Sequence, residues 1–268
     1  MKDVKGKVVL VTGAAMGMGK LLSEKFCEDG ARVIMVDVNA ESLKASIEEF
    51  KNRGFEVFDY VCDLTNRDKV YEMAEWVREN VGTVQALVNN AGVVYNGNFL
   101  DQDDEKISRT VDVNLKALMW TMKAFLPGMI ENNEGHVLNL ASASGFIGVP
   151  GVAVYAATKW GVIGLSESIR YELMKLKKNI KFTIVCPSYV ATGMFEGVKP
   201  PKMTRFLTPQ RIVDIMYDAF KKDKLYVLEP FMVKMTPSLK ALLPIKAFDW
   251  VQKVFGVVTG ADTLKGRQ

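Results

Sequence analysis

The sequence is poor in the residue types that build disulfide frameworks and metal sites. Its 268 residues include three cysteines, Cys27, Cys62 and Cys186, and one histidine, His136. The cysteines are odd in number, stand far apart and form no Cys-x-x-Cys pair, so neither a disulfide framework nor a metal cage is indicated. A single histidine gives little support to zinc-dependent alcohol dehydrogenase chemistry or to a Ser-His-Asp hydrolase. We therefore expect a cytoplasmic protein without a metal.

Long hydrophobic runs and blocks of like charge are also missing. The first apolar run, 8–11, is too short for the core of a signal peptide. No stretch approaches the roughly 20 apolar residues that span a bilayer. The 35 basic and 31 acidic residues are mixed along the chain and leave a formal charge of +4. Export, membrane spanning and nucleic-acid binding are not expected, although attachment to a membrane surface stays open.

What is present suits one globular domain. The chain is 49% hydrophobic and long enough to bury a core, and short β-branched runs alternate with longer segments of helical period. This alternation predicts an α/β fold, a doubly wound parallel sheet (Rossmann fold) in a single domain over 1–268. The predicted strands are 7–12, 32–37, 56–61, 86–89, 136–140 and 181–185. The predicted helices are 17–28, 41–52, 67–79, 105–125, 154–175 and 210–222.

Two segments lie outside this alternation. The segment 187–207 is rich in Pro, Gly and Met and is predicted to be a substrate loop. The segment 231–258 is an apolar C-terminal extension with interspersed lysines. Because exposed large apolar groups favour aggregation, we expect this extension to pack over the substrate loop or on a neighbouring subunit, burying Trp250 and Phe255. Peripheral contact with a membrane is the alternative.

A glycine-rich turn follows the first predicted strand, with Gly13, Gly17 and Gly19 in Thr-Gly-Ala-Ala-Met-Gly-Met-Gly. Glycine permits a tight turn and lets backbone amides approach a pyrophosphate, while the helix that follows directs its positive dipole end at the anion. Asp37 ends the second predicted strand, where a carboxylate accepts hydrogen bonds from the adenosine ribose and repels a 2′-phosphate. Since the turn holds no Lys or Arg, the pattern predicts NAD rather than NADP.

Three further residues suggest acid/base chemistry. Tyr155 and Lys159 are spaced to share one face of a predicted helix. A nearby ammonium favours a phenolate, so the pKa of Tyr155 is expected below the ordinary value of about 10. Ser142 follows the fifth predicted strand, at the end of a parallel sheet where ligands bind, and its hydroxyl could orient a substrate oxygen. Alone, each of these patterns is typical of an ordinary solvated surface.

Together and in this order, the motifs resemble the short-chain dehydrogenase/reductase family from about Val8 to Thr192, nearest in appearance to its retinol and hydroxysteroid dehydrogenase branch. The resemblance implies that Tyr155 is the acid/base, that Ser142 positions the substrate oxygen, and that Lys159 lowers the tyrosine pKa and holds the ribose. Asn114 matches the family asparagine that supports proton exchange with solvent. One departure is Ser188, which stands where the family usually has glycine and puts the local backbone path in question.

The resemblance also implies a site for NAD. Its members come from the glycine-rich turn, the ends of the strands and the catalytic helix. They are Gly13, Met16, Gly17, Met18, Gly19, Asp37, Asp63, Leu64, Asn90, Ala91, Tyr155, Lys159, Pro187, Val190 and Thr192.

The expected reaction is hydride transfer between the nicotinamide and a secondary alcohol or ketone on a hydrophobic substrate, such as a steroid, bile acid or retinoid-like compound. A small polyol or an acyl-thioester ketone is the alternative substrate. A nucleotide-sensing scaffold without activity is the alternative function, because a fold does not determine function. A homo-oligomer, either dimer or tetramer, is the expected state.

Overall fold

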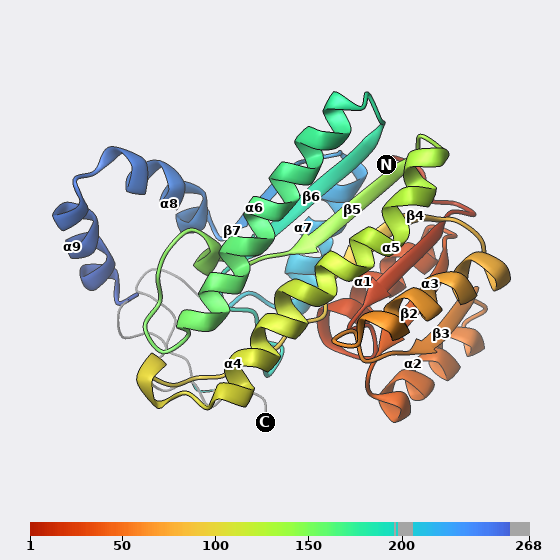
Figure 1. Cartoon of the computed structure of the whole chain (residues 1–268), viewed down its shortest axis with the longest axis horizontal. Coiled ribbons are helices and arrows are strands. Elements are labelled where there is room, and N and C mark those ends of the chain that lie inside the picture. The colour runs from red at the N-terminus through yellow and green to blue at the C-terminus, as the bar shows by residue number, and fades with distance from the viewer. Residues whose placement is uncertain (196, 198–205, 258–268) are drawn as a thin grey trace.

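The computed structural model describes residues 1–195, 197 and 206–257 (Figure 1). In this part of the chain, one seven-stranded sheet has the order β3-β2-β1-β4-β5-β6-β7, and every neighbouring pair is parallel. The strands are β1 (Val8–Thr12), β2 (Arg32–Asp37), β3 (Val57–Val61), β4 (Val84–Asn89), β5 (Gly135–Leu140), β6 (Ile180–Pro187) and β7 (Tyr226–Glu229). The predicted doubly wound parallel sheet is confirmed.

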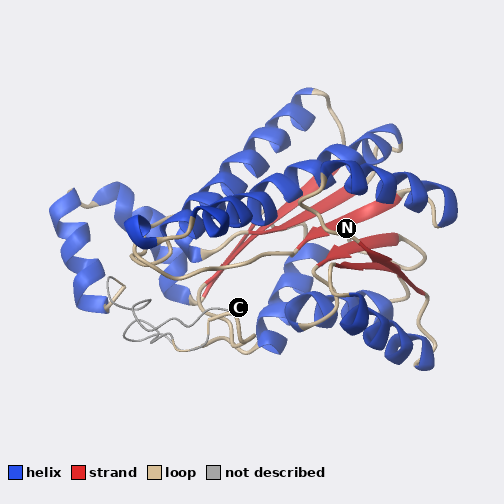
Figure 2. Cartoon of the chain, turned by 60° about the horizontal axis from the view of Figure 1, so that its bottom comes forward, coloured by secondary structure: helices blue, strands red, loops and turns tan. Residues whose placement is uncertain are grey.

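Helices cover both faces of the sheet (Figure 2). Phe26, Phe50 and Phe220 bury one face under α1, α2 and α7. Met73 and Met122 belong to the core under α3, α5 and α6 on the other face. Two covered faces explain why strand β1 is buried at every position, a continuous apolar run rather than an alternating one. The helices are α1 (Gly17–Glu28), α2 (Ala40–Asn52), α3 (Arg67–Asn80), α4 (Asp104–Val111), α5 (Ala117–Glu131), α6 (Ala153–Lys175), α7 (Pro209–Lys221), α8 (Phe231–Leu242) and α9 (Ile245–Phe255).

The sheet order reverses between β1 and β4, which places a crevice at their carboxyl ends. A buried amide network holds the centre of the sheet and its helices in register. Asn89 Nδ2 donates to Asn139 Oδ1 over 2.8 Å, and Asn139 Nδ2 donates to the Ser166 hydroxyl of α6 over 2.8 Å. Thr121 of α5 donates to Asn89 Oδ1 over 2.7 Å. These bonds position α6, which carries Tyr155 and Lys159, against β5.

Two features of the fold differ from the sequence-based expectation. The prediction of one helix over 105–125 is wrong, because a π-helical turn at Asp112–Lys116 separates α4 from α5. Asn114 lies in that turn and bonds the backbone of Val93, so a tertiary contact accompanies the wider turn. The short strand β7 was not predicted, because it has only four residues, of which only Val227 is buried, and it is a strand through its pairing with β6.

Helices α8 and α9 form a lobe that projects from the edge of the domain beyond β7 (Figure 1). Strands β6 and β7 are parallel and end side by side, at Pro187 and Glu229. The lobe, which follows β7 directly, therefore begins at the edge of the sheet where β6 also ends. Within the described residues, no helix is both long enough and apolar enough to span a membrane.

Candidate active site

The glycine-rich turn has the backbone geometry that its sequence predicts. Gly13 and Gly17 adopt φ of +63° and +59°, values that disfavour side chains with a Cβ. A Cβ on Gly13 would also lie 3.0 Å from the Cα of Ala91. Gly19 faces inward, where a Cβ would collide with the Gly13 carbonyl oxygen, so this glycine permits close packing beneath the turn rather than lining it.

The end of β4 is bonded to this turn. Asn90 Nδ2 donates to the carbonyl oxygens of Thr12 and Gly13, each over 3.0 Å. The Thr12 hydroxyl accepts the amides of Asn90 and Ala91 over 3.0 and 3.1 Å and donates to Val88 O. The segment after β4 and the turn after β1 therefore form one rigid wall of the crevice.

Carboxylates lie at the far end of the crevice. Asp37 accepts the amide of Ala15 at Oδ2 and the amide of Asn39 at Oδ1, each over 3.0 Å, which orients it beside the turn. Asp63 forms an ion pair with Arg109 of α4 over 3.5 Å. Partial burial acts to raise the pKa of Asp63, but hydrogen bonds from Thr65 and the charge of Arg109 together hold that pKa below its ordinary value. Arg109 was missed by sequence reasoning, because nothing near it in the chain indicates that α4 brings it to the crevice.

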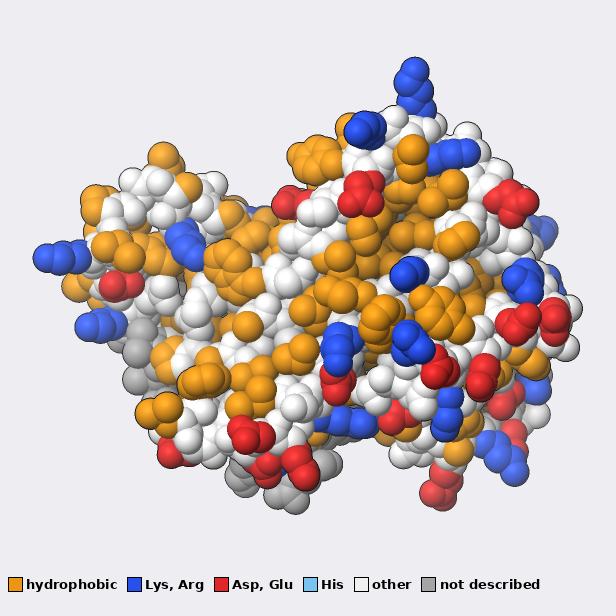
Figure 3. Space-filling view, in the orientation of Figure 1, with side chains coloured by type: hydrophobic (Ala, Val, Ile, Leu, Met, Phe, Trp, Pro, Cys, Tyr) orange, Lys and Arg blue, Asp and Glu red, His pale blue; other side chains and the backbone are white. Residues whose placement is uncertain are grey.

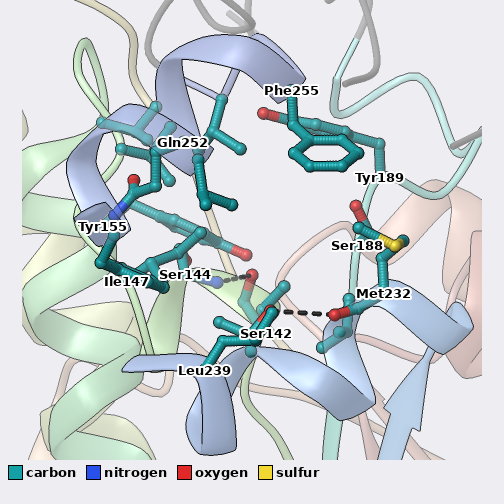
Figure 4. A pocket seen from close by; sticks show the side chains of 18 of the residues that line it. Ser142, Ser144, Ile147, Tyr155, Ser188, Tyr189, Met232, Leu239, Gln252 and Phe255 are labelled. Atoms are coloured by element: carbon teal, nitrogen blue, oxygen red, sulfur yellow. Dashed lines mark hydrogen bonds between the residues drawn. The ribbon is translucent and has the colours of Figure 1, made fainter. Parts of the chain in front are cut away.

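Tyr155 and Ser142 meet where the crevice adjoins a second, apolar pocket (Figure 4). The Ser142 oxygen accepts the amide of Ser144 over 3.2 Å, which leaves its proton available for Tyr155 or for a substrate oxygen. Burial raises the pKa of Tyr155 to about 12, while the hydrogen bond with Ser142 acts in the opposite direction. The expected lowering of this pKa is thus not found, because burial outweighs the other effects.

Lys159 lies in the same helix, buried to 3% exposure, with its ammonium 5.5 Å from the centre of the Tyr155 ring. It donates to the Leu140 carbonyl over 2.8 Å, which leaves two of the three N–H donors of an ammonium for other partners. Burial lowers the pKa of Lys159 to about 8. The residue shares the face of α6 with Tyr155, as the spacing predicts.

Asn114 is buried beneath these residues and does not line the crevice. Its Oδ1 accepts the amide of Val93 and its Nδ2 donates to the Val93 carbonyl, both over 2.8 Å. A longer bond of 3.4 Å reaches the Thr158 hydroxyl of α6. Its side chain therefore ties the segment after β4 to α6, the helix that carries Tyr155 and Lys159. A role in proton exchange stays a prediction.

The structure gathers most of the predicted site residues around the one crevice. Only Gly19 and Asn114 stand behind its wall. Those that line it are Gly13, Met16, Gly17, Met18, Asp37, Asp63, Leu64, Asn90, Ala91, Ser142, Tyr155, Lys159, Pro187, Val190 and Thr192. Ser188 raises no difficulty for the backbone, since its φ is not positive and its amide continues the sheet by donating to Glu229 O over 2.7 Å.

The adjoining pocket is apolar and is closed by the C-terminal lobe. Ile147, Val149 and Val152 line it from the segment before α6, and Tyr189 and Phe195 line it from the loop after β6. Helices α8 and α9 contribute Met232, Val233, Thr236, Leu239, Phe248, Val251, Gln252 and Phe255. Residues of α8 and α9 thus line one pocket together with Tyr189 and Phe195 of the predicted loop, over which the extension was expected to pack. Residues 196, 198–205 and 258, which belong to the predicted loop and extension, lie outside the described residues.

The burial expected of Trp250 is not found within the chain. Its side chain is 65% exposed on the outer face of α9, whereas Phe255 is partly buried and lines the pocket. The two residues were expected to behave alike because both are large and apolar, but helical geometry turns them to different sides. Burial of Trp250 against another molecule stays a prediction.

Among the described residues, no group of three or more His, Cys, Asp or Glu side chains comes close enough together to hold a metal ion. The three cysteines are buried and unpaired. Buried His136 bonds Thr183 through Nε2 over 2.9 Å, well inside the core at the start of β5.

Comparison with known proteins agrees with this geometry. Residues 7–202 match the family model described as short chain dehydrogenase. The chain is 39% identical over 271 residues to epidermal retinol dehydrogenase 2 of Mus musculus, covering 100% of this chain and 88% of that protein. It is 34% identical over 244 residues to estradiol 17-beta-dehydrogenase 11 of Macaca fascicularis, covering 91% of this chain and 81% of that protein.

Solved structures show the same fold. A short-chain dehydrogenase/reductase from Burkholderia phymatum in complex with NAD has a TM-score of 0.81 at 23% identity, over 99% of this chain and 100% of that chain. A metagenomic short-chain oxidoreductase in complex with NADP has a TM-score of 0.72 at 30% identity, over 84% of this chain and 96% of that chain. With its relatives among retinol and hydroxysteroid dehydrogenases, the chain belongs to the short-chain dehydrogenase/reductase family.

Proposed function

We propose that this oxidoreductase uses NAD and transfers a hydride between the nicotinamide and a secondary alcohol or ketone on a hydrophobic substrate of the steroid, bile acid or retinoid class. One observation carries the proposal. Ser142 and Tyr155 line both the crevice that suits a dinucleotide and the apolar pocket beside it. A substrate in the pocket would therefore place its oxygen at the two hydroxyls and its carbon toward the crevice.

The residues of the crevice fit a dinucleotide. The positive φ angles at Gly13 and Gly17 expose the backbone of the turn at the start of α1, where a pyrophosphate would be bound. Asp37, at the end of β2, would accept hydrogen bonds from the adenosine ribose. Lys159 would donate hydrogen bonds to the nicotinamide ribose. Bound NAD would supply the nicotinamide ring that accepts or donates the hydride.

The side chains of this chain divide the remaining work. In oxidation, Tyr155 accepts the alcohol proton at its Oη, and in reduction it donates a proton to the carbonyl oxygen. Ser142 donates a hydrogen bond that orients the same oxygen. The apolar walls around Val149, Phe195 and Phe255 exclude water from the reacting carbon. A panel of steroid, bile acid and retinoid alcohols with NAD, followed at the nicotinamide absorbance, tests the proposal, and absence of turnover throughout would contradict it.

Cofactor preference provides a sharper prediction, at Asp37. A carboxylate beside the ribose repels the 2′-phosphate of NADP, and the repulsion is stronger in a partly buried crevice than in water. We expect Asp37→Ala to narrow the NAD to NADP ratio of kcat/KM by about tenfold or more, because removing a like charge restores more than about 1.4 kcal/mol. Val38→Arg, at an exposed position lining the crevice, should narrow it further.

Both ratios are to be measured at fixed ionic strength, because salt screens the effect. Asp59→Ala is the matched control, since this exposed carboxylate lies in β3 away from the crevice. An unchanged ratio in Asp37→Ala would show that another group sets the preference.

The outer face of the C-terminal lobe supports peripheral membrane contact, which we propose as its role. Leu242 and Ile245 are 81% and 77% exposed where α8 meets α9, and Trp250 follows on the same lobe. Exposed Lys246 and Lys253 lie among them on α9, and Figure 3 shows hydrophobic and basic side chains side by side on this lobe. Apolar groups with basic residues at their border are suited to an anionic lipid surface.

Sedimentation with vesicles tests this role. We expect binding to vesicles that contain anionic lipid, reduced about tenfold or more in Ile245→Gln with Trp250→Gln, because each large side chain loses apolar burial. Leu100→Gln is the control, since Leu100 is 93% exposed but lies between β4 and α4, outside the lobe. If vesicle binding is unchanged and light scattering instead shows a smaller assembly, the lobe contacts a subunit.

We also propose that the protein is a homo-oligomer and that it is located in the cytoplasm. Hydrophobic side chains gather over α5 and α6 in Figure 3. Trp160, Tyr171, Met174 and Leu176 on or beside α6 are all exposed in the single chain. Exposed apolar patches of this kind are typical of subunit contacts. Light scattering on the purified protein would decide between a monomer and a dimer or tetramer.

A further inference from the structure

The lobe of α8 and α9 walls the apolar pocket without belonging to the hydrophobic core of the domain. Each of the three core clusters in the described chain is formed without a residue of 231–255. Only Val233 of α8 and Phe248 of α9 are buried. Side chains such as Leu239 and Phe255 line the pocket instead (Figure 4). Core packing therefore does little to hold the lobe in place.

Lys240, near the end of α8, connects the lobe to the rest of the domain. Its ammonium donates to the Phe146 carbonyl oxygen over 3.0 Å. It also lies 4.1 Å from the centre of the Trp160 ring, within the range of a cation–π contact. Among the described residues, this is the one side-chain hydrogen bond that joins 231–255 to a part of the chain before β7.

Both partners of Lys240 belong to fixed parts of the domain. Phe146 packs against the core under α3, α5 and α6. Trp160 lies in α6, which is bonded to β5 through Ser166. The residue after Phe146, Ile147, lines the pocket, as does the residue before Lys240 in α8. The contact of Lys240 therefore ties one wall of the pocket to another.

An attachment of this kind is weak enough to be broken. Lys240 is exposed, and the Trp160 side chain is 44% exposed. One cation–π contact and one hydrogen bond at such a position shift an equilibrium by about tenfold. A lobe held in this way can open and close during turnover. Closing would exclude water from the reacting carbon, and opening would let the product leave.

We propose that the α8–α9 lobe is a lid over the substrate pocket and that Lys240 is the positioning residue that holds it closed. The inference rests on the proposed function, because the lid covers the pocket assigned to the alcohol or ketone. Lys240 has no part in proton or hydride transfer. It acts on the fraction of the protein in which the walls of the pocket are assembled, and apparent substrate affinity falls with that fraction.

The position of the lobe can be measured without substrate. Spin labels at Ser168→Cys on α6 and Lys253→Cys on α9, both exposed positions, report the distance between domain and lobe. The native cysteines are buried and should resist labelling. Dilution with unlabelled protein removes distances between subunits. Lys240→Met should increase the population at distances other than the main one by about threefold or more, because both contacts of the ammonium are lost.

A conservative variant and a matched control accompany this measurement. Lys240→Arg should keep the parent distribution, since a guanidinium also donates hydrogen bonds and stacks on aromatic rings. Lys246→Met should keep it as well. Lys246 is exposed on α9 and has no hydrogen bond or ion pair to a described residue, so this variant removes a charge from the lobe without a contact.

Steady-state kinetics provide the second measurement. With the best alcohol of the panel, Lys240→Met should raise KM about threefold or more and leave kcat within about twofold, because saturating substrate draws the lobe closed. Lys240→Arg should restore the parent KM, and Lys246→Met should not change it. Light scattering on each variant checks that the assembly is the same.

An unchanged distance distribution or an unchanged KM in Lys240→Met would overturn the inference. Equal changes in Lys246→Met would do the same, because the effect would then come from charge alone. Absence of turnover by the parent on every alcohol would contradict the proposed function instead. The distance measurement would still decide whether Lys240 holds the lobe, so the two failures are distinguishable.

Discussion

Replacing Tyr155 with phenylalanine should lower kcat by about a hundredfold or more, because positioned acid/base groups contribute roughly 10²–10⁴-fold to rate. The ring would still fill its place beside Phe195, 6.2 Å away between ring centres, while the proton donor is lost. Cofactor affinity should stay within a few-fold of the parent. The measurements are steady-state kinetics on the best alcohol of the panel and a titration with NAD.

A second tyrosine of the same pocket is the control for this variant. Tyr189 is partly buried and lines the pocket, but of the two tyrosines it is Tyr155 that also lines the crevice, together with Ser142 and Lys159. Tyr189→Phe should keep most of the turnover. If Tyr155→Phe also keeps turnover within a few-fold of the parent, Tyr155 is not the acid/base.

The Tyr155 pKa also sets a direction for the pH dependence. Burial raises it to about 12, so the group is protonated near neutral pH and is ready to act as an acid in reduction. Oxidation needs the phenolate, whose fraction grows as pH rises toward that pKa. The kcat/KM for alcohol oxidation should therefore increase with pH from 7 upward, more steeply than that for ketone reduction.

Replacing Lys159 with methionine should separate activity from stability. The ammonium is the buried cation beside Tyr155, and it is expected to bind the nicotinamide ribose, so the variant should lose both affinity for NAD and about a hundredfold or more in kcat/KM. A helix-surface lysine without a functional role would leave both unchanged. Lys175→Met, at the end of the same helix, is the control.

Stability should respond in the opposite sense from activity. Burial lowers the pKa of Lys159 to about 8 from an unfolded value near 10.5, so the folded state disfavours the ammonium. This cost is fully present below pH 8 and is relieved as pH rises from 8 to 10.5, where the unfolded chain binds more protons. At pH 7 the variant removes the cost but leaves the Leu140 carbonyl without its donor.

These opposing effects should keep the change in unfolding free energy at pH 7 below about 2 kcal/mol. The parent should also gain stability between pH 8 and 10 relative to the variant. Denaturant unfolding of both proteins at pH 7 and pH 9.5 measures the two quantities. A loss of several kcal/mol at pH 7, with activity retained, would assign Lys159 a structural role instead.

Local chemistry made much of the site predictable. Gly13 and Gly17 have positive φ angles, which glycine adopts more readily than other residues, so the short turn could be predicted from its own sequence. The helical repeat alone places Tyr155 and Lys159 on one face. The ends of parallel strands meet at one edge, so Asp37 and Ser142 were expected near the same crevice. The structure brings these residues together there.

Contacts between distant segments could not be predicted in this way. Arg109 reaches Asp63 because a π-helical turn and the sheet order place α4 at the crevice. Gln252 enters the pocket because α9 folds back over residues far earlier in the chain. The direction in which the Tyr155 pKa is shifted depends on how completely neighbouring residues exclude water from the phenol. The four-residue spacing of Tyr155 and Lys159 does not reveal that burial.

The sequence by itself determined the parallel sheet, the glycine-rich turn and the helix that carries Tyr155 and Lys159, since each follows from a short-range repeat or from the conformational limits of a few adjacent residues. The tertiary structure decided the rest. Burial, the closure of the pocket by α8 and α9, and the side of α9 on which Trp250 and Gln252 lie depend on packing between segments that are far apart in the chain. Solvent exclusion by that packing is the physical reason why the pKa values and the polar contacts of the pocket emerge only in three dimensions.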